Sequence, residues 1–424
     1  MKKLLVSYTT IAMLAVAVVS PMGAFAEVVG NIGNGVDSNS SATVNSNNST
    51  TVSQSNAASV TNTISVKSNT GDNNASRNTG GEVGISTGNA GASVGISNMA
   101  NSNSAKLDTC CTAGGDSSVL NQGNGDSSDN DATLNKKNST ALSQTNIADV
   151  ANFVNVDSNT GNNKASRNTG SGNGSEVSID TGRSIVSPIL IKNAVNSNQA
   201  VLGSSVGAFG NGDLTIGNAG NGVESDNDAT ANLNNSTAVA QTNAASILNW
   251  VDVTSNTGDN DADRNTGGDV MIDTGDSAVA VVLDNKANSN AAWLDNCGCV
   301  GLDDLVVKNL GNGDSTDNDA KVNKNNSTAA YQANLSEVAN FGYFDTNSGG
   351  NKANRNTGAV YGWSDPSVDT GVAYTEVGAT TAVNNNVLNN GYVGMTPPPV
   401  SNGNLSNGGY WWNYGMMWNG NSSY

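Results

Sequence analysis

The feature that most constrains this chain is a block of about 48 residues that occurs four times with its internal spacing unchanged. Each copy opens with Gly-Asn-Gly, continues through Asn-Ser-Thr and Ser-Asn-Thr-Gly, and ends at Arg-Asn-Thr-Gly; the third motif is degenerate in the last copy. Extra length lies outside the block. This pattern predicts four repeats of about 90 residues, at about 33–122, 123–219, 220–310 and 311–390.

Inside each block, apolar residues and a few amides occupy every second position, which predicts β-strands with one face turned inward. In the second copy this series includes Leu134, Leu142, Ala148, Val150, Val154 and Val156. A strand of this length would run about 95 Å at roughly 3.3 Å per residue, so we expect the chain to bend and coil. The predicted fold class is all-β, a β-solenoid resembling a β-helix.

Amides within the inward series predict hydrogen-bonded ladders between stacked repeats, which would satisfy their buried polar groups. The same pair of amides recurs in the first three copies: Gln54 and Asn56, Gln144 and Asn146, and Gln241 and Asn243. The alternative is that these residues lie at a corner of the fold. A single Arg also recurs before each Asn-Thr-Gly, and Arg77, Arg167, Arg264 and Arg355 are expected to pin the turn; contacts to a glycan or anion are the alternative.

The N-terminus has the pattern of a secretory signal peptide over residues 1–26, with two lysines, an apolar stretch and Ala24-Phe25-Ala26. We therefore expect a mature chain beginning at Glu27 that is secreted or held at the cell surface, with no later membrane span. The net charge is −18, which fits a soluble exterior and no nucleic-acid partner. Such polarity also allows disorder, although the shared register of four copies argues for a folded solenoid over 27–390.

Four cysteines fall in two pairs at equivalent places in the first and third copies, namely Cys110 with Cys111 and Cys297 with Cys299. In an exported chain these predict disulfides within or between molecules. Acidic residues recur near the Gly-Asn-Gly turn, and six of them are candidate Ca²⁺ ligands: Asp126, Asp129, Asp131, Asp314, Asp317 and Asp319. A solvated acidic corner is the alternative, and no other cofactor is expected.

The composition changes after residue 390. The tail, 391–424, is rich in Gly, Asn, Pro and aromatic residues, including Trp411, Trp412 and Trp418. Aromatic side chains at this density predict contact with a sugar ring or a protein pocket, or else a cap for the open end of the repeats. No His is present, no nucleophile motif was found, and the carboxylates recur instead of converging once, so we expect no enzyme activity.

Two segments resemble the curlin repeats of bacterial functional amyloids. One is the run from Leu142 to Asn152, which contains Gln144, Asn146 and Ala148, and the other is Gly71-x-Asn73-x-Ala75. The chain is also similar to Asn/Thr/Gly-rich secreted repeat proteins of bacterial cell surfaces. The resemblance implies extracellular fibres, matrix or adhesion, with self-association and cell-surface partners.

The expected function is a secreted structural or adhesive repeat protein. A glycan- or ice-binding module is the alternative, and a carboxylate-based polysaccharide-degrading β-helix enzyme is a more distant one.

Overall fold

The chain forms an all-β structure in which parallel strands are stacked in sheets. A computed structural model describes residues 2–19, 27–107, 117–170, 176–203, 214–294, 305–357 and 366–390, and every regular element within these ranges is a β-strand. The all-β prediction is therefore confirmed. None of these residues forms a helix of the length and apolarity needed to cross a membrane.

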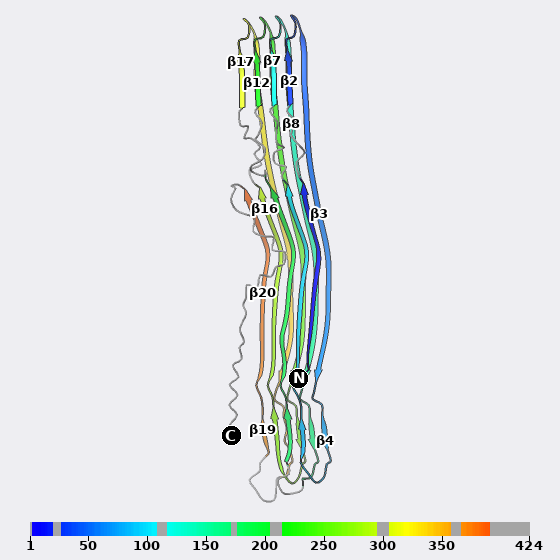
Figure 1. Ribbon diagram of the computed structural model, residues 1–424. Helices are drawn as coiled ribbons and strands as arrows, with labels where there is room; N and C mark the ends of the chain where they lie inside the picture. The colour runs from blue at the N-terminus through cyan, green and yellow to red at the C-terminus, as the bar shows by residue number, and fades with distance from the viewer. Residues whose placement is uncertain are drawn as a thin grey trace.

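Four long strands form one sheet that runs the length of the molecule (Figure 1). They are β3 (Asn39–Asn69), β8 (Asp129–Asn159), β13 (Asp226–Asn256) and β18 (Asp317–Asn347), each of 31 residues. Neighbours pair in parallel and residue for residue, without a register shift, in the order β18-β13-β8-β3. Equivalent residues of the sequence block therefore lie side by side across the sheet.

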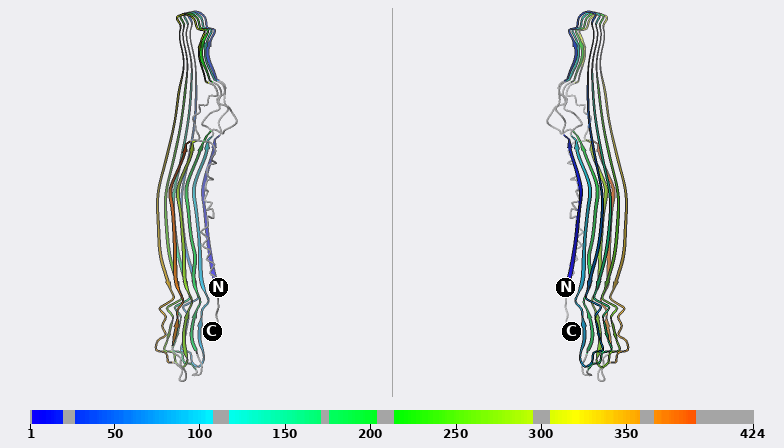
Figure 2. Two further views of the ribbon diagram at one scale, coloured as in Figure 1. Left: turned by 90° about the vertical axis from the view of Figure 1, so that its left-hand side faces the viewer. Right: turned by 90° about the vertical axis from the view of Figure 1, so that its right-hand side faces the viewer.

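Shorter strands return the chain along the other face of the molecule, and Figure 2 shows the two layers joined by turns. One return sheet contains β6 (Ala90–Leu107), β11 (Ser184–Leu202), β16 (Ser277–Leu294) and β20 (Ala373–Asn390). Another contains β2 (Glu27–Ile32), β7 (Ser117–Gln122), β12 (Leu214–Ala219) and β17 (Leu305–Leu310). We call each long strand with its neighbouring shorter strands a rung: rung 1 is β2–β6, rung 2 β7–β11, rung 3 β12–β16 and rung 4 β17–β20.

Two smaller sheets close the end of the molecule opposite to the Gly-Asn-Gly turns. They contain β4 (Asn74–Ser76), β9 (Lys164–Ser166) and β14 (Asp261–Asp263), and β5 (Val83–Ser86), β10 (Glu176–Thr181), β15 (Asp269–Thr274) and β19 (Ser367–Asp369). Aliphatic side chains, including Ala165 and Ile179, pack between them. The first strand, β1 (Lys2–Val19), lies outside the four rungs and pairs in parallel with β6.

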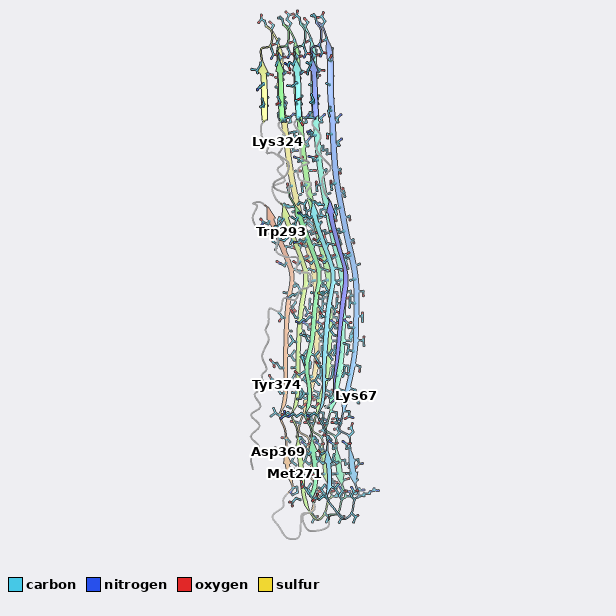
Figure 3. All side chains as sticks on the ribbon, viewed as in Figure 1. Lys67, Met271, Trp293, Lys324, Asp369 and Tyr374 are labelled. Atoms are coloured by element: carbon cyan, nitrogen blue, oxygen red, sulfur yellow. The ribbon has the colours of Figure 1, made fainter. Side chains whose placement is uncertain are left out.

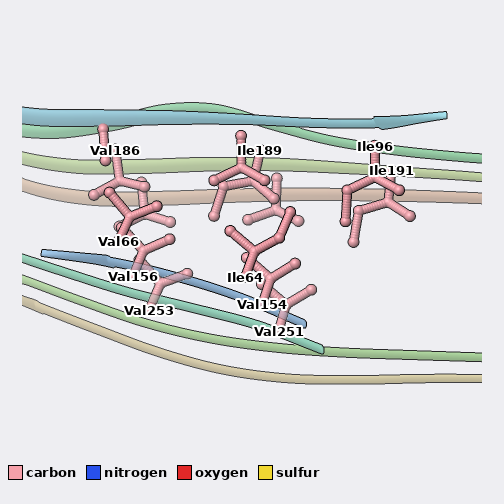
Figure 4. Packing of buried hydrophobic residues seen from close by; sticks show 14 of the residues in the cluster. Ile64, Val66, Ile96, Val154, Val156, Val186, Ile189, Ile191, Val251 and Val253 are labelled. Atoms are coloured by element: carbon pink, nitrogen blue, oxygen red, sulfur yellow. The ribbon is translucent and has the colours of Figure 1, made fainter. Parts of the chain in front are cut away.

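The core is a thin layer of branched aliphatic side chains between the two sheets. In the largest cluster, Val154 and Val251 from the long strands face Ile189 and Ile191 from a return strand (Figure 4). Apolar residues of one rung stack on those of the next, so each rung completes the core of its neighbour. A few large apolar residues in each copy therefore suffice to build a core that the rungs share.

The expectation that the long alternating segment bends and coils is wrong. Each long strand is continuous over 31 residues and curves only gently, and the chain reverses at the turns on either side (Figure 1). The Ser-Asn-Thr-Gly turn shows why: Gly161 lies so close to the next rung that an added β-carbon would overlap the carbonyl oxygen of Gly258. Only glycine permits this approach, so the glycine fixes the position of the turn just beyond the end of the strand.

Candidate functional site

The inward amides form continuous hydrogen-bonded columns from rung to rung. Gln144 Nε2 donates to Gln54 Oε1 at 2.7 Å, and Gln241 Nε2 donates to Gln144 Oε1 at 2.8 Å. Asn146 Nδ2 donates to Asn243 Oδ1 at 3.2 Å. These side chains are buried, so each amide forms its hydrogen bonds with a neighbouring rung instead of with water.

A second kind of bond, which the sequence did not predict, links the two layers. Asn103 on the return strand donates to Asn146 Oδ1 at 2.9 Å and also to Asn198 Oδ1 of the next return strand at 3.0 Å. Asn56 of rung 1 in turn donates to Asn103 at 2.8 Å. Asn103 therefore bonds both within its own layer and to the facing layer, and such bonds link the two layers directly.

The recurring arginines lie in the turn that follows the small end strands. Arg77, Arg167, Arg264 and Arg355 all have positive φ angles, between 53° and 64°, in the left-handed region that side chains rarely adopt. Arg355 makes a two-pronged contact to Asp263, with Nε to Oδ1 at 3.0 Å and Nη2 to Oδ2 at 3.2 Å. The Nε of Arg264 lies 3.5 Å from Asp263 Oδ2. Two of the four arginines therefore contact one carboxylate, at an exposed site where such pairs contribute little stability.

The acidic residues form columns across rungs instead of converging on one point. Asp129, Asp226 and Asp317 are neighbours in the register of the long strands, and so are Asp131, Asp228 and Asp319. Asp126 and Asp314 occupy the turn before them, in rungs 2 and 4. Within the described ranges no group of three or more His, Cys, Asp or Glu residues is arranged to hold a metal ion. Calcium binding stays a prediction.

Burial, and after it the stacking of like charges, raises the pKa of three carboxyl groups in columns of this kind. Burial raises the pKa of Asp226 above its ordinary value of 3.8, and the charges of Asp129 and Asp317 raise it further. Burial likewise raises the pKa of Asp228, and the charges of Asp226 and Asp319 raise it further. The pKa of Asp273 is raised by burial and by Asp180 and Asp369 on neighbouring rungs. Parallel in-register stacking thus brings carboxylates together that are far apart in sequence.

Two groups of predicted site residues lie outside the described residues. They are the cysteines Cys110, Cys111, Cys297 and Cys299, and the tail tryptophans Trp411, Trp412 and Trp418.

The outer face of the long sheet carries an exposed aromatic column. Phe153, Trp250 and Phe341 occupy one position in rungs 2, 3 and 4, with exposed fractions of 37%, 49% and 51%. The rings of Trp250 and Phe341 lie 5.7 Å apart between centroids and are tilted by 39°. Sequence reasoning missed this column; the signal that could have found it is an aromatic residue at one position of the block in copies two to four.

Three exposed threonines of rung 1 on this face are not repeated in rung 2. Thr51, Thr61 and Thr63 are exposed in rung 1, and the aligned residues in rung 2 are Ala141, Ala151 and Phe153. At these three positions threonine is therefore not repeated from rung 1 to rung 2, which interrupts the flat threonine array that an ice-facing surface needs. The outer face instead presents aromatic rings spaced by the distance between strands.

No family model, no curated protein and no solved structure matches this chain.

Proposed function

We propose that the chain is an exported structural or adhesive protein of a bacterial cell surface or extracellular matrix, built as a β-solenoid of four repeats. The observation that carries the proposal is the use of the repeated polar groups. Asn152, for example, is fully buried and bonds to Asn62, Asn98, Asn193 and Asn249 at once. The recurring amides are committed to joining rungs and layers, which suits a rigid scaffold better than a catalyst.

The sequence supports an exported location through the signal-peptide pattern of residues 1–26. The test uses the source bacterium, antibodies against the purified protein, and fractionation into cytosol, envelope and medium. We expect a chain that begins at Glu27 in the envelope or medium. Full-length chain confined to the cytosol would refute the proposal. A deletion strain should have a weaker surface layer or matrix and should adhere less.

A glycan-binding role is the second candidate, and the aromatic column supports it. Sugar rings stack on exposed aromatic faces, and Phe153, Trp250 and Phe341 offer three rings in a row on a rigid sheet. Pull-down with insoluble polysaccharides tests it. Trp250→Ala should reduce binding severalfold, whereas Tyr374→Ala, which removes an aromatic side chain that is 50% exposed on the return layer, should not. Equal binding by both variants would exclude the column as the contact.

A further inference from the structure

The two outermost rungs have long strands with only one strand neighbour. β3 of rung 1 pairs only with β8, and β18 of rung 4 pairs only with β13, among the described strands. We propose that rung 4 of one copy pairs in parallel and in register with rung 1 of a second copy, so that chains stack head to tail into a filament. This deepens the structural role proposed above and rests on it for its biological setting, while the pairing itself is a property of the purified chain.

The outer side of rung 4 leaves exposed several side chains that are buried at the same positions in rungs 2 and 3. Asn152 and Asn249 are fully buried in rungs 2 and 3, whereas Asn340, at the same position in rung 4, is exposed. Val150 and Ile247 are buried, whereas the aligned Val338 is only partly buried. Side chains that the other rungs cover with a neighbour therefore remain in water on this face. A further rung in the same register would cover them.

The amide columns have a direction that allows continuation. Asn62 donates to Asn152, Asn152 to Asn249, and Asn249 to Asn340, at 2.7 to 2.8 Å. Among the described residues, this column starts at Asn62, whose Oδ1 has no donor, and ends at Asn340, whose Nδ2 has no acceptor. Stacking rung 1 of a second copy on rung 4 would join these two ends with the polarity of every internal step.

A polar atom on rung 1 lacks the partner that this stacking supplies. Asn101 lies on β6 beneath β1, which pairs with the residues on either side of it, and its Oδ1 has no hydrogen-bond partner in the described structure. Its internal equivalents have one, because Asn196 Oδ1 accepts from Asn101 and Asn288 Oδ1 accepts from Asn196, both at 3.0 Å. At the far end, Asn384 accepts from Asn288 at 3.1 Å, and its own Nδ2 has no acceptor among the described residues. Head-to-tail stacking aligns Asn384 of one copy with Asn101 of the next.

Charges at the two faces also fit. The register aligns Lys67, Asp157, Thr254 and Asp345 in one column, and Lys67 Nζ lies 3.1 Å from Asp157 Oδ2. In the stack, Asp345 would meet Lys67 of the next copy in the same geometry. Figure 3 shows Lys67 on the side of rung 1, across the molecule from Tyr374 on rung 4.

The acidic columns avoid repulsion at the same junction. Asp317 and Asp319 of rung 4 would face Asn39 and Ser41, because rung 1 alone has no acid at these two positions of the long strand. Asp369 would face Ser86 for the same reason. The rung that forms the opposite face is thus the one whose sequence lacks these acids.

The edge of rung 1 accepts an added parallel strand in the structure itself. β1 pairs with β6, and both β1 and β20 have 18 residues. β1 begins opposite Ala90, which is also where the register of the return sheet places Ala373, the first residue of β20. β1 therefore occupies the place that β20 of a second copy would take. Removal of residues 1–26 would free this edge and leave all the pairings among the four rungs intact.

Glycine columns provide a test that separates stacking from folding. At Gly71, Gly161 and Gly258, an added β-carbon would overlap backbone atoms of the following rung, whereas at Gly349 in rung 4 the nearest atom is Asn347 Oδ1 at 3.9 Å. At Gly125, Gly222 and Gly313 the overlap is with the preceding rung, and at Gly35 in rung 1 nothing lies within 4 Å. Gly349→Ala and Gly35→Ala are therefore compatible with the folded chain but clash in the stack.

The experiment compares chains from Glu27 to Tyr424, purified as monomers and followed by sedimentation and electron microscopy. We expect the unaltered chain to form filaments with one copy per roughly 19 Å, four rungs of about 4.8 Å each. Gly349→Ala and Gly35→Ala should each abolish filaments at the concentration where the parent assembles, with melting temperatures unchanged. Gly378→Ala, which adds the same methyl group to rung 4 where nothing lies within 4 Å and the side-chain direction is outward, should assemble normally.

A second variant tests the unpaired amide. Asn384→Asp keeps the oxygen that accepts from Asn288 but removes the donor and places a charge opposite Asn101, so the concentration needed for assembly should rise at least tenfold. An unaltered chain that stays monomeric at millimolar concentration would overturn the inference, as would filaments of Gly349→Ala equal to the parent. Dye binding or a 4.8 Å reflection decides nothing, because a single chain already has stacked strands. If the chain is exported but does not assemble, the stacking is refuted and the proposed function stands. If the chain assembles but remains in the cytosol, the proposed function is refuted and the stacking stands.

Discussion

Asn152 donates a hydrogen bond from Nδ2 to Oδ1 of Asn249 at 2.7 Å, and both side chains are fully buried although they lie 97 residues apart in sequence. This contact illustrates how the rungs are joined. It is a step between rungs, it is repeated at the same position in each rung, and it satisfies an amide that would otherwise be buried without a partner.

Replacing Asn152 with Leu should destabilise the chain by about 3 kcal/mol, because the amide donors of Asn62 and Asn98 would each lose an acceptor in a buried site. Chemical denaturation measures the change. Asn155→Leu makes the same substitution at an exposed position of the same strand and should alter stability by less than about 0.5 kcal/mol. Equal effects of the two variants would show that the column adds nothing beyond local strand preference.

Adding a methyl group at Gly161 should be more harmful than its size suggests. The β-carbon of Gly161→Ala would overlap the backbone of Gly258 in the next rung, so the two rungs must separate locally, at about 3 kcal/mol. Gly88→Ala is the matched control, because nothing lies within 4 Å of a β-carbon at that position. Thermal melting distinguishes them. A normal melting temperature for Gly161→Ala would mean that the backbones of Gly161 and Gly258 lie far enough apart to admit a β-carbon.

The acidic columns predict how stability depends on pH. Since the pKa values of Asp226 and Asp228 are raised in the folded chain, folding takes up protons above pH 3.8, and stability falls as the pH rises through the raised values. Replacing both residues with Asn should therefore raise the melting temperature at pH 7 by about 1–3 °C, and the difference should vanish near pH 3. Asp149→Asn, between Ser59 and Ser246 in the register, should show no such pattern. A loss of stability at pH 7 would reverse the sign of the argument.

Calcium should stabilise the same columns if the carboxylates of Asp129, Asp131, Asp317 and Asp319 act as its ligands, since an ion bound only to the folded chain raises its stability by mass action. Millimolar Ca²⁺ is expected to raise the melting temperature, and chelator to reverse the effect. Sodium chloride at equal ionic strength controls for simple screening. If salt alone reproduces the shift and calorimetry detects no heat of binding, these residues are solvated carboxylates.

The strands and their inward faces were predictable because a period of two, held in phase over repeated copies, has few interpretations other than stacked strands. Gln144 and Asn146 were identified as ladder residues for the same reason. The bonds from Asn103 to Asn146 were not predictable, since they depend on the distance between two layers whose connecting segments vary in length. The recurrence of the acids was visible in the sequence, but the side-by-side placement of Asp129 and Asp226 follows from the register of the strands. The column that contains Trp250 was missed, because it appears only when the copies are aligned position by position.

The continuous pairing of the 31-residue strands also has a mechanical consequence. A pull along the strands loads the hydrogen bonds of a whole ladder together in shear, so many must break at once. A pull that peels rung 4 from rung 3 loads the hydrogen bonds between them one after another. The molecule should therefore be strong along its length and weak across it, which suits a tether that is attached to its surroundings at the two ends of its strands.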